Sequence, residues 1–258
     1  MNAKLFSIIT PTYNCKKEIE KTINSVLSQK KSLFEYIIID ANSNDGTLGV
    51  LNEYKDKIKL IIGNDKGIYD AMNKGIDAAK GKYLYFLGAG DCLRKNILEK
   101  LEKIIPRVGV YFFYGDIRRI NPGNYIIYHY GFNKWNIGTK NIHHQAIFYN
   151  KDIFELLGKY DLKYRIAADY CKNIECFGNK YIKKLYVNLL IANYMGKGIS
   201  DNVKDKKFIK EKYRIILDNL GYRYYIFSII RDNIARILGF FRLKSVVILI
   251  LEKLKLRL

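Results

Sequence analysis

Short apolar runs alternate with amphipathic stretches along the first third of the chain, and polar residues follow each run. The runs are rich in β-branched and aromatic residues and therefore predict strands; they cover residues 5–10, 34–39, 59–62 and 83–87. Between them, apolar residues at helical spacing predict helices over residues 17–29, 48–55 and 68–79. Strands and helices that alternate so closely predict an α/β fold with a mostly parallel, doubly wound sheet flanked by helices.

Polar residues follow all four predicted strands. They are Thr12 and Tyr13, Asp40, Asp65, and Asp91. The carboxyl ends of parallel strands share one edge of a sheet, where ligands bind in open α/β folds. A single residue of this kind is commonly a turn residue or a helix N-cap, and that alternative stays open for each. Together they predict a ligand crevice at this edge.

Two nucleotide-binding classes do not fit the sequence. It has no G-x-x-x-x-G-K-[ST] segment, so a P-loop is not expected. Gly88 and Gly90 begin like a dinucleotide-binding fingerprint, but Leu93 stands where the third glycine belongs. The segment also follows the fourth predicted strand, whereas that fingerprint follows the first. A Rossmann dehydrogenase is therefore a poor fit.

The second half has a weaker pattern. We expect a strand over residues 108–114, a strand pair over 118–130, helices over 154–160 and 169–177, and a strand within 181–194. Residues 142–148 contain the pair His143-His144. Adjacent residues of a strand face opposite ways, so the pair is not expected to ligate one ion. A structural histidine is the alternative.

The net charge narrows the range of partners. The 45 lysines and arginines exceed the 25 acidic residues, which gives +20 and favours nucleic acid, anionic lipid or phosphate-bearing ligands. The four cysteines have no CxxC or metal-ligand spacing, so reduced thiols in a cytosolic compartment are expected. The N-terminus passes directly into a predicted strand, and no signal peptide is expected.

The last part of the chain, from residue 204, is predicted to be helical. Residues 223–258 carry eight Lys/Arg against Asp232 and Glu252, with apolar residues near helical spacing. The longest uncharged stretches, 224–230 and 245–251, are far shorter than the roughly 18 to 20 residues of a membrane span. The pattern predicts a basic amphipathic tail on an anionic membrane face. Packing against the catalytic domain or a partner subunit is the alternative.

Four segments, taken as an ordered set, resemble the successive motifs of family 2 glycosyltransferases with the GT-A fold. They are residues 7–14, 40–47, 65–75 and 86–91. The resemblance implies an inverting transferase that moves a hexosyl or N-acetylhexosaminyl group from a nucleoside diphosphate sugar, with UDP favoured, to an acceptor hydroxyl. It implies a GT-A domain over residues 1–200, a helical extension over 201–258, and a divalent metal, Mn²⁺ or Mg²⁺.

The resemblance also implies a donor site. Its residues are Pro11, Thr12, Tyr13, Asp40, Asp65, Lys74, Gly90 and Asp91. Tyr13 offers an aromatic face to the base, Asp40 can accept from a base N–H, and Lys74 can neutralise a diphosphate oxygen. Packing of Tyr13 and solvation of Lys74 are the alternatives. Asp91 matches the last carboxylate of the family's Asp-x-Asp motif and is the expected metal ligand. Ala89 replaces the first, so weak metal binding, or binding only with donor, is expected.

On the acceptor side, Asp169 matches the family's catalytic base, which accepts the proton of the attacking hydroxyl. Many relatives have Glu-Asp here, whereas this chain has Ala168-Asp169, which leaves one candidate. Helix capping is the alternative for Asp169. Asp116, His144 and Gln145 are assigned to the acceptor or sugar side, with Asp116 the next candidate base. Gly196 and Gly198 suit a flap over the diphosphate or a plain loop.

The expected partners are a nucleoside diphosphate sugar, a saccharide or lipid-linked acceptor, an anionic membrane surface and, in one possibility, a second copy of the chain. The resemblance and the basic tail together imply bacterial surface polysaccharide or glycolipid synthesis in the cytoplasm, peripherally on the inner face of the cell membrane. One alternative is a non-catalytic nucleotide-sugar or glycan-binding module, because Ala89 removes a carboxylate. Another is a nucleic-acid-binding protein, motivated only by the charge of +20; no nucleic-acid partner is expected.

Overall fold

Strand β1 (Phe6–Thr12) lies inside a mixed sheet whose order is β3-β2-β1-β4-β8-β6-β9-β5, with β7 paired to β6. The computed structural model describes residues 4–196 and 203–240. The other strands in this part of the chain are β2 (Phe34–Asp40), β3 (Lys59–Ile62), β4 (Tyr83–Phe86), β5 (Cys92–Leu93), β6 (Tyr111–Asn121), β7 (Asn124–Tyr128), β8 (Ile147–Asn150) and β9 (Lys183–Tyr194).

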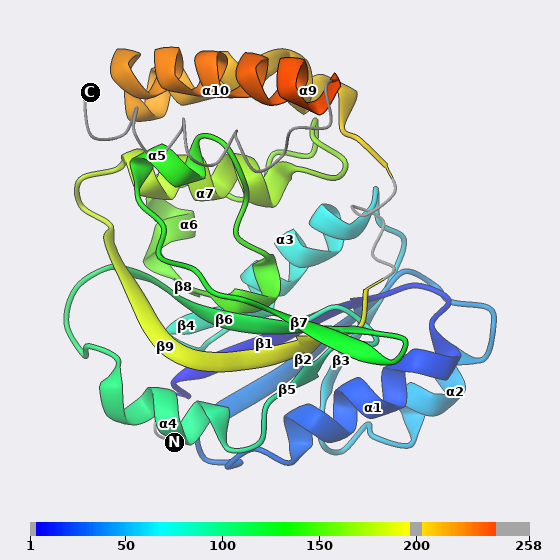
Figure 1. Ribbon diagram of the computed structural model, residues 1–258. Coiled ribbons are helices and arrows are strands. Elements are labelled where there is room, and N and C mark those ends of the chain that lie inside the picture. The colour runs from blue at the N-terminus through cyan, green and yellow to red at the C-terminus, as the bar shows by residue number, and fades with distance from the viewer. Residues whose placement is uncertain (1–3, 197–202, 241–258) are drawn as a thin grey trace.

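Helices cover both faces of this sheet (Figure 1). On one face lie α1 (Lys16–Leu27), α2 (Thr47–Asn52) and α4 (Ile97–Ile104). On the other lie α3 (Ile68–Ala78), α5 (Lys134–Ile137), α6 (Asp152–Leu157) and α7 (Ala168–Gly178). The two faces have separate hydrophobic clusters, because strands such as β2 are buried on both sides and send alternate side chains to each. This is the α/β sandwich that the sequence predicts.

The first four strands all run parallel, β2 to β3 and β1 to both β2 and β4. Their carboxyl ends therefore meet at one edge, as expected. Pro11 fits there because the pairing of β1 with β4 ends at Ile9, opposite Phe86, so the N–H that proline lacks has no ladder partner to lose. Beyond β4, strand β8 runs antiparallel to both β4 and β6.

Two local predictions were wrong. The expected strand over residues 108–114 and the first strand of the pair form one continuous strand, β6, whose hairpin with β7 turns at Pro122 and Gly123. His143 and His144 are not in a strand: a short 3-10 helix, η1, covers His144–Ala146. The argument that a strand would separate the two histidines therefore does not apply.

The C-terminal helices α9 (Lys206–Leu220) and α10 (Tyr222–Phe240) pack against the domain on the side of α7 and α5 (Figure 1). Phe208 of α9 is buried, and its ring lies 5.0 Å from that of Tyr170. Ile216 and Leu220 belong to the same hydrophobic cluster as the sheet. Helix α9 therefore shares the core of the domain, and the boundary at residue 200 stays a prediction.

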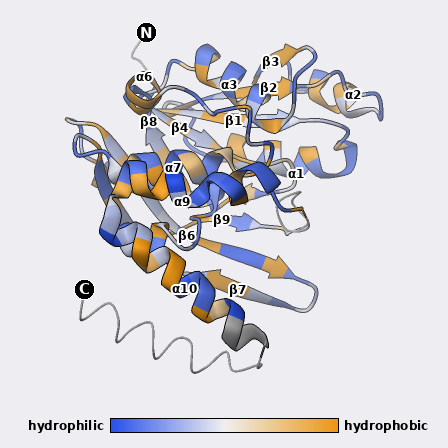
Figure 2. Cartoon of the chain, turned by 90° about the horizontal axis from the view of Figure 1, so that it is seen from above, coloured by the Kyte–Doolittle hydropathy of each residue, from blue (hydrophilic) through white to orange (hydrophobic). Residues whose placement is uncertain are grey.

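Helix α10 packs against both α9 and α5, and Trp135 of α5 contacts two of its aromatic side chains. The Trp135 ring lies 4.5 Å from Tyr224 and 5.0 Å from Phe227, and Phe227 is buried. Phe227, one of the apolar residues of the predicted membrane-facing side, thus packs against the domain, while the membrane contact of the tail stays a prediction. Hydrophobic and hydrophilic turns alternate along α10 (Figure 2). Within the described ranges, no helix combines the length and apolar content needed to cross a bilayer. Residues 241–258 of the predicted tail lie outside the described part.

Candidate functional site

The nucleotide end of the predicted site lies at the ends of β1 and β2. Tyr13 is 63% exposed, so its ring is available to a planar ligand. Asp40 is fully buried instead. Its carboxylate accepts hydrogen bonds from the Thr12 hydroxyl, the Ser43 hydroxyl and the Ser43 backbone N–H, each at 2.8 Å. The Asp40 carboxylate thus connects the two loops around Tyr13, and its predicted direct contact with a base N–H stays a prediction.

Asp65 lies in the loop just before α3, and Lys74 lies nearly two turns into that helix. Asp65 is half-buried and accepts the Gly67 N–H at 2.9 Å, which forms a turn before the helix. Lys74 donates to the Asn64 carbonyl, and its Nζ lies 3.7 Å from Asp70. The ammonium group is thus held over the loop that contains Asp65. The structure brings these two predicted residues together.

Asp91 lies in the turn between β4 and β5, and it is 6% exposed. Its Oδ1 accepts the Met195 N–H at 3.0 Å and its Oδ2 accepts Gln145 Nε2 at 2.8 Å. The capping alternative does not apply, because the next helix, α4, begins at Ile97 with Asn96 as its N-cap. Gly90 makes the turn possible with a φ of +101°, a conformation that side chains disfavour, while its N–H donates to Thr22 Oγ1.

Asp169 lies in the first turn of α7 and is 7% exposed. The N-cap of this helix is Ala167, so Asp169 is not the capping residue. Its carboxylate accepts from the Tyr69 hydroxyl at 2.8 Å, the Tyr170 N–H at 2.8 Å and Asn141 Nδ2 at 3.1 Å. Burial raises the pKa of Asp169 above 3.8, and the three donors oppose that rise.

His144 and Gln145 connect the two carboxylates. His144 Nδ1 lies 4.0 Å from Asp169 Oδ2, while the neighbouring Gln145 donates to Asp91. Burial lowers the pKa of His144 to about 4, so the imidazole is neutral near pH 7. Among the described residues, the buried Nε2 of His144 has no hydrogen-bond partner. Two adjacent residues of η1 thus reach the predicted metal ligand and the predicted base.

Asp116 is held by other groups. It is buried on β6 and accepts hydrogen bonds from His129 Nδ1 at 2.6 Å, the Tyr186 hydroxyl at 2.9 Å and the Tyr130 N–H at 3.2 Å. These bonds tie β6 to β9 and to the strand that follows the hairpin. Asp116 is therefore occupied in structural contacts, which makes it poorly suited as a second base.

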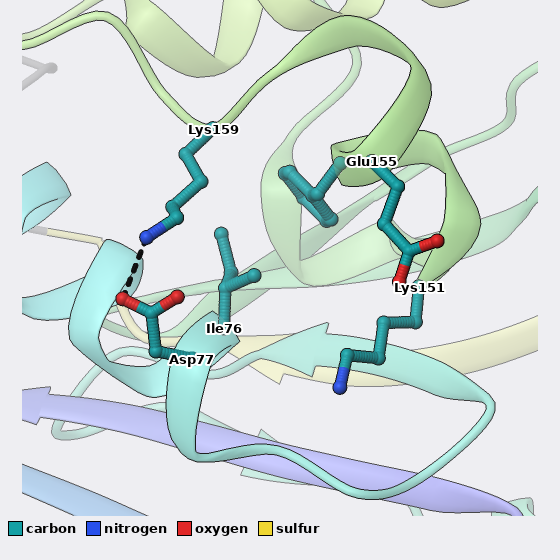
Figure 3. A pocket seen from close by; sticks show the side chains of 6 residues that line it. Ile76, Asp77, Lys151, Glu155 and Lys159 are labelled. Atoms are coloured by element: carbon teal, nitrogen blue, oxygen red, sulfur yellow. Dashed lines mark hydrogen bonds and ion pairs between the residues drawn. The ribbon is translucent and has the colours of Figure 1, made fainter.

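A small surface pocket lies elsewhere, between α3 and α6 (Figure 3). Its lining includes Ile76, Phe154 and the ion pair of Lys159 with Asp77, at 2.6 Å. Ile76 and Asp77 lie in the last turn of α3, at the end of the helix that is remote from Asp65. No predicted site residue lines the pocket. In the described part of the chain, no group of three or more His, Cys, Asp or Glu side chains is arranged to hold a metal.

Two residues of the site were missed from the sequence. Tyr69 belongs to the segment 65–75, which resembles a family motif and from which only Asp65 and Lys74 were selected. Its place in that motif is the sequence signal that could have identified it as a site residue. Asn141 has no such signal: it donates to Asp169 and accepts from Asn173, a partner 32 residues away. The predicted flap of Gly196 and Gly198 lies at the limit of the described residues, which end at Gly196 on this side.

The sequence matches the family model described as Glycosyl transferase family 2 over residues 7–159. A PGL/p-HBAD biosynthesis glycosyltransferase of Mycobacterium bovis is 35% identical over 228 residues, which cover 81% of this chain and 84% of that protein. A UDP-Glc:alpha-D-GlcNAc-diphosphoundecaprenol beta-1,3-glucosyltransferase of Escherichia coli, WfaP, is 41% identical over 90 residues, which cover 34% of this chain and 36% of that protein.

Among solved structures, the fragment 1–349 of Staphylococcus aureus TarS, in complex with UDP-GlcNAc, has a TM-score of 0.67 and 20% identity. The match covers 83% of this chain, and the chain spans 66% of that fragment. This likeness supports the fold. The extent of the family match and the length of the mycobacterial alignment lead to one conclusion: the chain belongs to glycosyl transferase family 2 and is a glycosyltransferase.

Proposed function

We propose that the protein transfers a sugar, with inversion, from a nucleoside diphosphate sugar to a hydroxyl of a saccharide acceptor carried on a lipid. The observation that supports this most is the position of the dipeptide His144-Gln145. His144 lies 4.0 Å from Asp169, and Gln145 donates a hydrogen bond to Asp91. A base for the acceptor hydroxyl and a carboxylate for the leaving diphosphate must act on one anomeric carbon, so their side chains must share one site.

The donor occupies the edge formed by β1, β2 and the start of α3. In this proposal Tyr13 stacks on the base, and Asp40 acts indirectly by positioning Thr12. Pro11 shapes the end of β1, Asp65 faces the ribose, and Lys74 approaches a diphosphate oxygen. UDP is the favoured nucleotide: the solved TarS fragment was bound to UDP-GlcNAc, and the name of the E. coli relative specifies UDP-Glc.

Asp91 is the proposed protein ligand for Mn²⁺ or Mg²⁺, beside the turn at Gly90. Hard cations prefer oxygen ligands, and a carboxylate fits that preference. Because Ala89 cannot add a second carboxylate, the diphosphate and water would supply the other oxygens. When bound, the cation neutralises charge on the departing diphosphate. Gln145 and the Met195 N–H hold the Asp91 carboxylate in a fixed orientation.

Asp169 is the proposed base. Its ionised carboxylate accepts the proton of the attacking hydroxyl while that oxygen approaches the anomeric carbon from the side opposite the diphosphate. The raised pKa of Asp169 suits this task, since a base with a higher pKa accepts a proton more readily. His144 and Gln145 border the space between the two carboxylates and are proposed to contact the transferred sugar or the acceptor.

The lipid-linked acceptor is inferred by analogy. The name of the E. coli relative specifies a diphosphoundecaprenol-linked sugar, and that of the mycobacterial relative specifies PGL/p-HBAD biosynthesis. Such acceptors belong to surface polysaccharide or glycolipid synthesis. We therefore propose that the protein works peripherally at the inner face of a bacterial cell membrane. A second copy of the chain remains part of the proposal without an assigned interface.

The proposed membrane contact is electrostatic and uses the exposed side of α9. Lys206, Lys207 and Lys210 are exposed there, whereas Phe208 is buried. Each lysine near an anionic surface contributes about 1 kcal/mol, so changing all three to glutamate in the full chain should reduce binding to phosphatidylglycerol vesicles at least about tenfold. The matched control changes three exposed lysines elsewhere, Lys30, Lys55 and Lys57, to glutamate. Equal losses in both variants would contradict a specific membrane face.

The proposed transfer is tested by nucleotide binding and by turnover. A thermal-shift series with UDP, GDP and dTDP, each with and without Mn²⁺, should give the largest rise in melting temperature for UDP with Mn²⁺. Release of UDP from UDP-GlcNAc or UDP-glucose should occur in the wild type and be lost in Asp169→Asn and Asp91→Asn. Nucleotide binding without any turnover would favour a non-catalytic binding module instead. Turnover that survives in Asp169→Asn would contradict the assigned base.

A further inference from the structure

The Asp169 carboxylate is held by donors that come from three separate segments. Tyr69 belongs to α3, Asn141 to the segment before η1, and the Tyr170 N–H to α7. Tyr69 lies 100 residues from Asp169 along the chain, so this contact exists only in the folded domain. A buried carboxylate needs such donors to remain ionised. Its orientation is therefore determined by the tertiary structure.

The Tyr69 hydroxyl has a defined place. The Tyr69 side chain is 7% exposed, and its ring lies 5.3 Å from that of Tyr160. Its hydroxyl lies 2.8 Å from Asp169 Oδ1 and 2.7 Å from the Ile166 carbonyl oxygen. One hydroxyl hydrogen cannot be donated fully to two acceptors. When Asp169 is ionised, the charged oxygen is the stronger acceptor and takes that hydrogen.

The two oxygens of Asp169 differ in how many donors they accept. Oδ1 accepts from both the Tyr69 hydroxyl and the Tyr170 N–H, which fills its two lone pairs. Among the described residues, Oδ2 accepts one hydrogen bond, from Asn141. The remaining lone pair is therefore on Oδ2, the oxygen that lies 4.0 Å from His144 Nδ1. This is the side that carries the proposed sugar and acceptor contacts.

Asn141 is itself held by hydrogen bonds to other buried side chains. Its Oδ1 accepts Asn173 Nδ2 at 2.8 Å, and Asn173 Oδ1 accepts the Tyr149 hydroxyl at 2.7 Å. Asn173 and Tyr149 are both fully buried. These bonds fix the Asn141 amide so that its Nδ2 donates toward Asp169. Each oxygen of the carboxylate is thus held by a side chain that has its own partners.

Resting on the proposed role of Asp169 as base, we propose that Tyr69 is a positioning residue. Its hydroxyl, with the Tyr170 N–H, occupies Asp169 Oδ1, so that Oδ2 accepts the proton of the acceptor hydroxyl. The same hydroxyl serves both protonation states, because its hydrogen can turn to the Ile166 carbonyl once Asp169 is protonated. Helix α3 and the loop before it therefore carry two proposed donor contacts, Lys74 and Asp65, and the helix also carries the residue that orients the base.

The Tyr69 hydroxyl should lower the pKa of Asp169. As a donor to Oδ1 it favours the ionised carboxylate, because hydrogen bonds to an ionised group are stronger than those to a neutral one. Loss of the hydroxyl should therefore raise the pKa of Asp169 by roughly one pH unit. Tyr69 and His143 influence the pKa of Asp169, and His144 lies 4.0 Å from its Oδ2. The other titratable groups near it are Tyr149, Tyr160 and Tyr170, whose pKa values are raised, so their hydroxyls stay uncharged while Asp169 titrates.

The test is a carbon NMR titration of the full chain, labelled with ¹³C at the aspartate carboxyl groups and free of metal. The Asp169 signal is identified by its loss in Asp169→Asn. In Tyr69→Phe its titration midpoint should rise by roughly one pH unit. The matched control is Tyr160→Phe, which removes a hydroxyl from the neighbouring ring that is not one of the three described donors to Asp169. In Tyr160→Phe the titration midpoint of Asp169 should equal that of the wild type.

A second variant keeps the packing intact. Replacement of Tyr69 by fluorotyrosine preserves the ring and makes the hydroxyl a stronger donor, so the Asp169 midpoint should fall. Turnover of UDP-GlcNAc or UDP-glucose should drop in Tyr69→Phe through kcat, while the Kd for UDP stays at its wild-type value. An unchanged or lowered midpoint in Tyr69→Phe, or equal shifts in Tyr69→Phe and Tyr160→Phe, would overturn the positioning role. Full turnover in Asp169→Asn would instead overturn the proposed function, whatever the titration gives.

Discussion

Gln145 Nε2 donates a hydrogen bond of 2.8 Å to Asp91 Oδ2, and both side chains are almost fully buried. The backbone of Gln145 is fixed as well, because its carbonyl accepts the Tyr85 hydroxyl at 2.8 Å. Tyr85 belongs to β4, the strand that leads to Asp91. The proposed metal ligand and the residue that orients it are therefore both attached to the same central strand.

This relationship predicts the effect of Gln145→Leu. The variant keeps the volume of the side chain but removes the donor to Asp91, so the carboxylate loses its fixed orientation. Changes in such supporting hydrogen bonds typically weaken metal binding about 10- to 100-fold. The Kd for UDP at a Mn²⁺ concentration below saturation, measured by calorimetry, should rise at least about threefold. Gln29→Leu is the matched control: Gln29 is equally buried and bonds Arg94 and Leu98 of another segment. It should lower stability without changing the Kd.

The metal requirement should reflect the single carboxylate. With Asp91 as its main protein ligand, half-maximal turnover should need Mn²⁺ or Mg²⁺ on the order of 1 mM or more, since few protein ligands give weak binding. Ala89→Asp would add a carboxylate two residues before Asp91 and should lower the required concentration about tenfold. Ala89→Asn is the control of equal size. Full turnover in excess chelator would contradict the metal assignment.

The sequence contained most of the information on the parallel half of the sheet. Apolar runs such as residues 34–39 are local features, and burial on both faces makes them easy to recognise. The clustering of Thr12, Asp40, Asp65 and Asp91 followed from topology alone, because parallel strands place their carboxyl ends together. What pattern could not supply was side-chain direction. Asp40 follows its strand as predicted, but Thr12 and Ser43 turn its carboxylate inward.

The antiparallel half depends on contacts between distant segments. His144 lies in a 3-10 helix because η1 must turn the chain into β8 next to β4. Phe227 has helical spacing suited to an amphipathic surface, yet Trp135, more than 90 residues earlier in the sequence, covers it. Tyr69 was hidden for the same reason, since its partner Asp169 is 100 residues away. Local periodicity cannot identify such partners.

Asp169 should make a contribution to the stability of the protein that falls as pH rises. Burial raises its pKa in the folded state above 3.8, while the unfolded chain keeps a value near that. Between the two values the folded state binds more protons than the unfolded state, so this contribution to the free energy of unfolding falls as pH rises. His144, with a pKa of about 4, is neutral over most of this range.

The comparison with Asp169→Asn isolates this effect. The difference in free energy of unfolding, wild type minus variant, should fall as pH rises above about 4 and level off once Asp169 is ionised in the folded state. Urea denaturation at each pH gives the value. Over the same range, kcat of the wild type should increase as Asp169 ionises, and the variant should lose about 10²- to 10⁴-fold in turnover at neutral pH. A stability difference that rises with pH would mean that the pKa of Asp169 is lowered in the folded state.

The position of α3 on β1 should be sensitive to the size of residue 75. A Cβ at Gly75 would lie 2.4 Å from Ile9 Cγ2, which is buried and cannot move away. Gly75→Ala should therefore cost about 1–3 kcal/mol of stability, although alanine favours helix by about 1 kcal/mol. Gly49→Ala in α2 is the control, since nothing lies within 4 Å of its Cβ, and it should stabilise by about 0.5–1 kcal/mol. Lys74 and Tyr69 lie on α3, and Asp65 lies in the loop just before it. Gly75→Ala should therefore also weaken UDP binding and raise the titration midpoint of Asp169. Gly49→Ala should change neither quantity. Equal effects of the two substitutions on UDP binding would mean that the seating of α3 on β1 does not control the site.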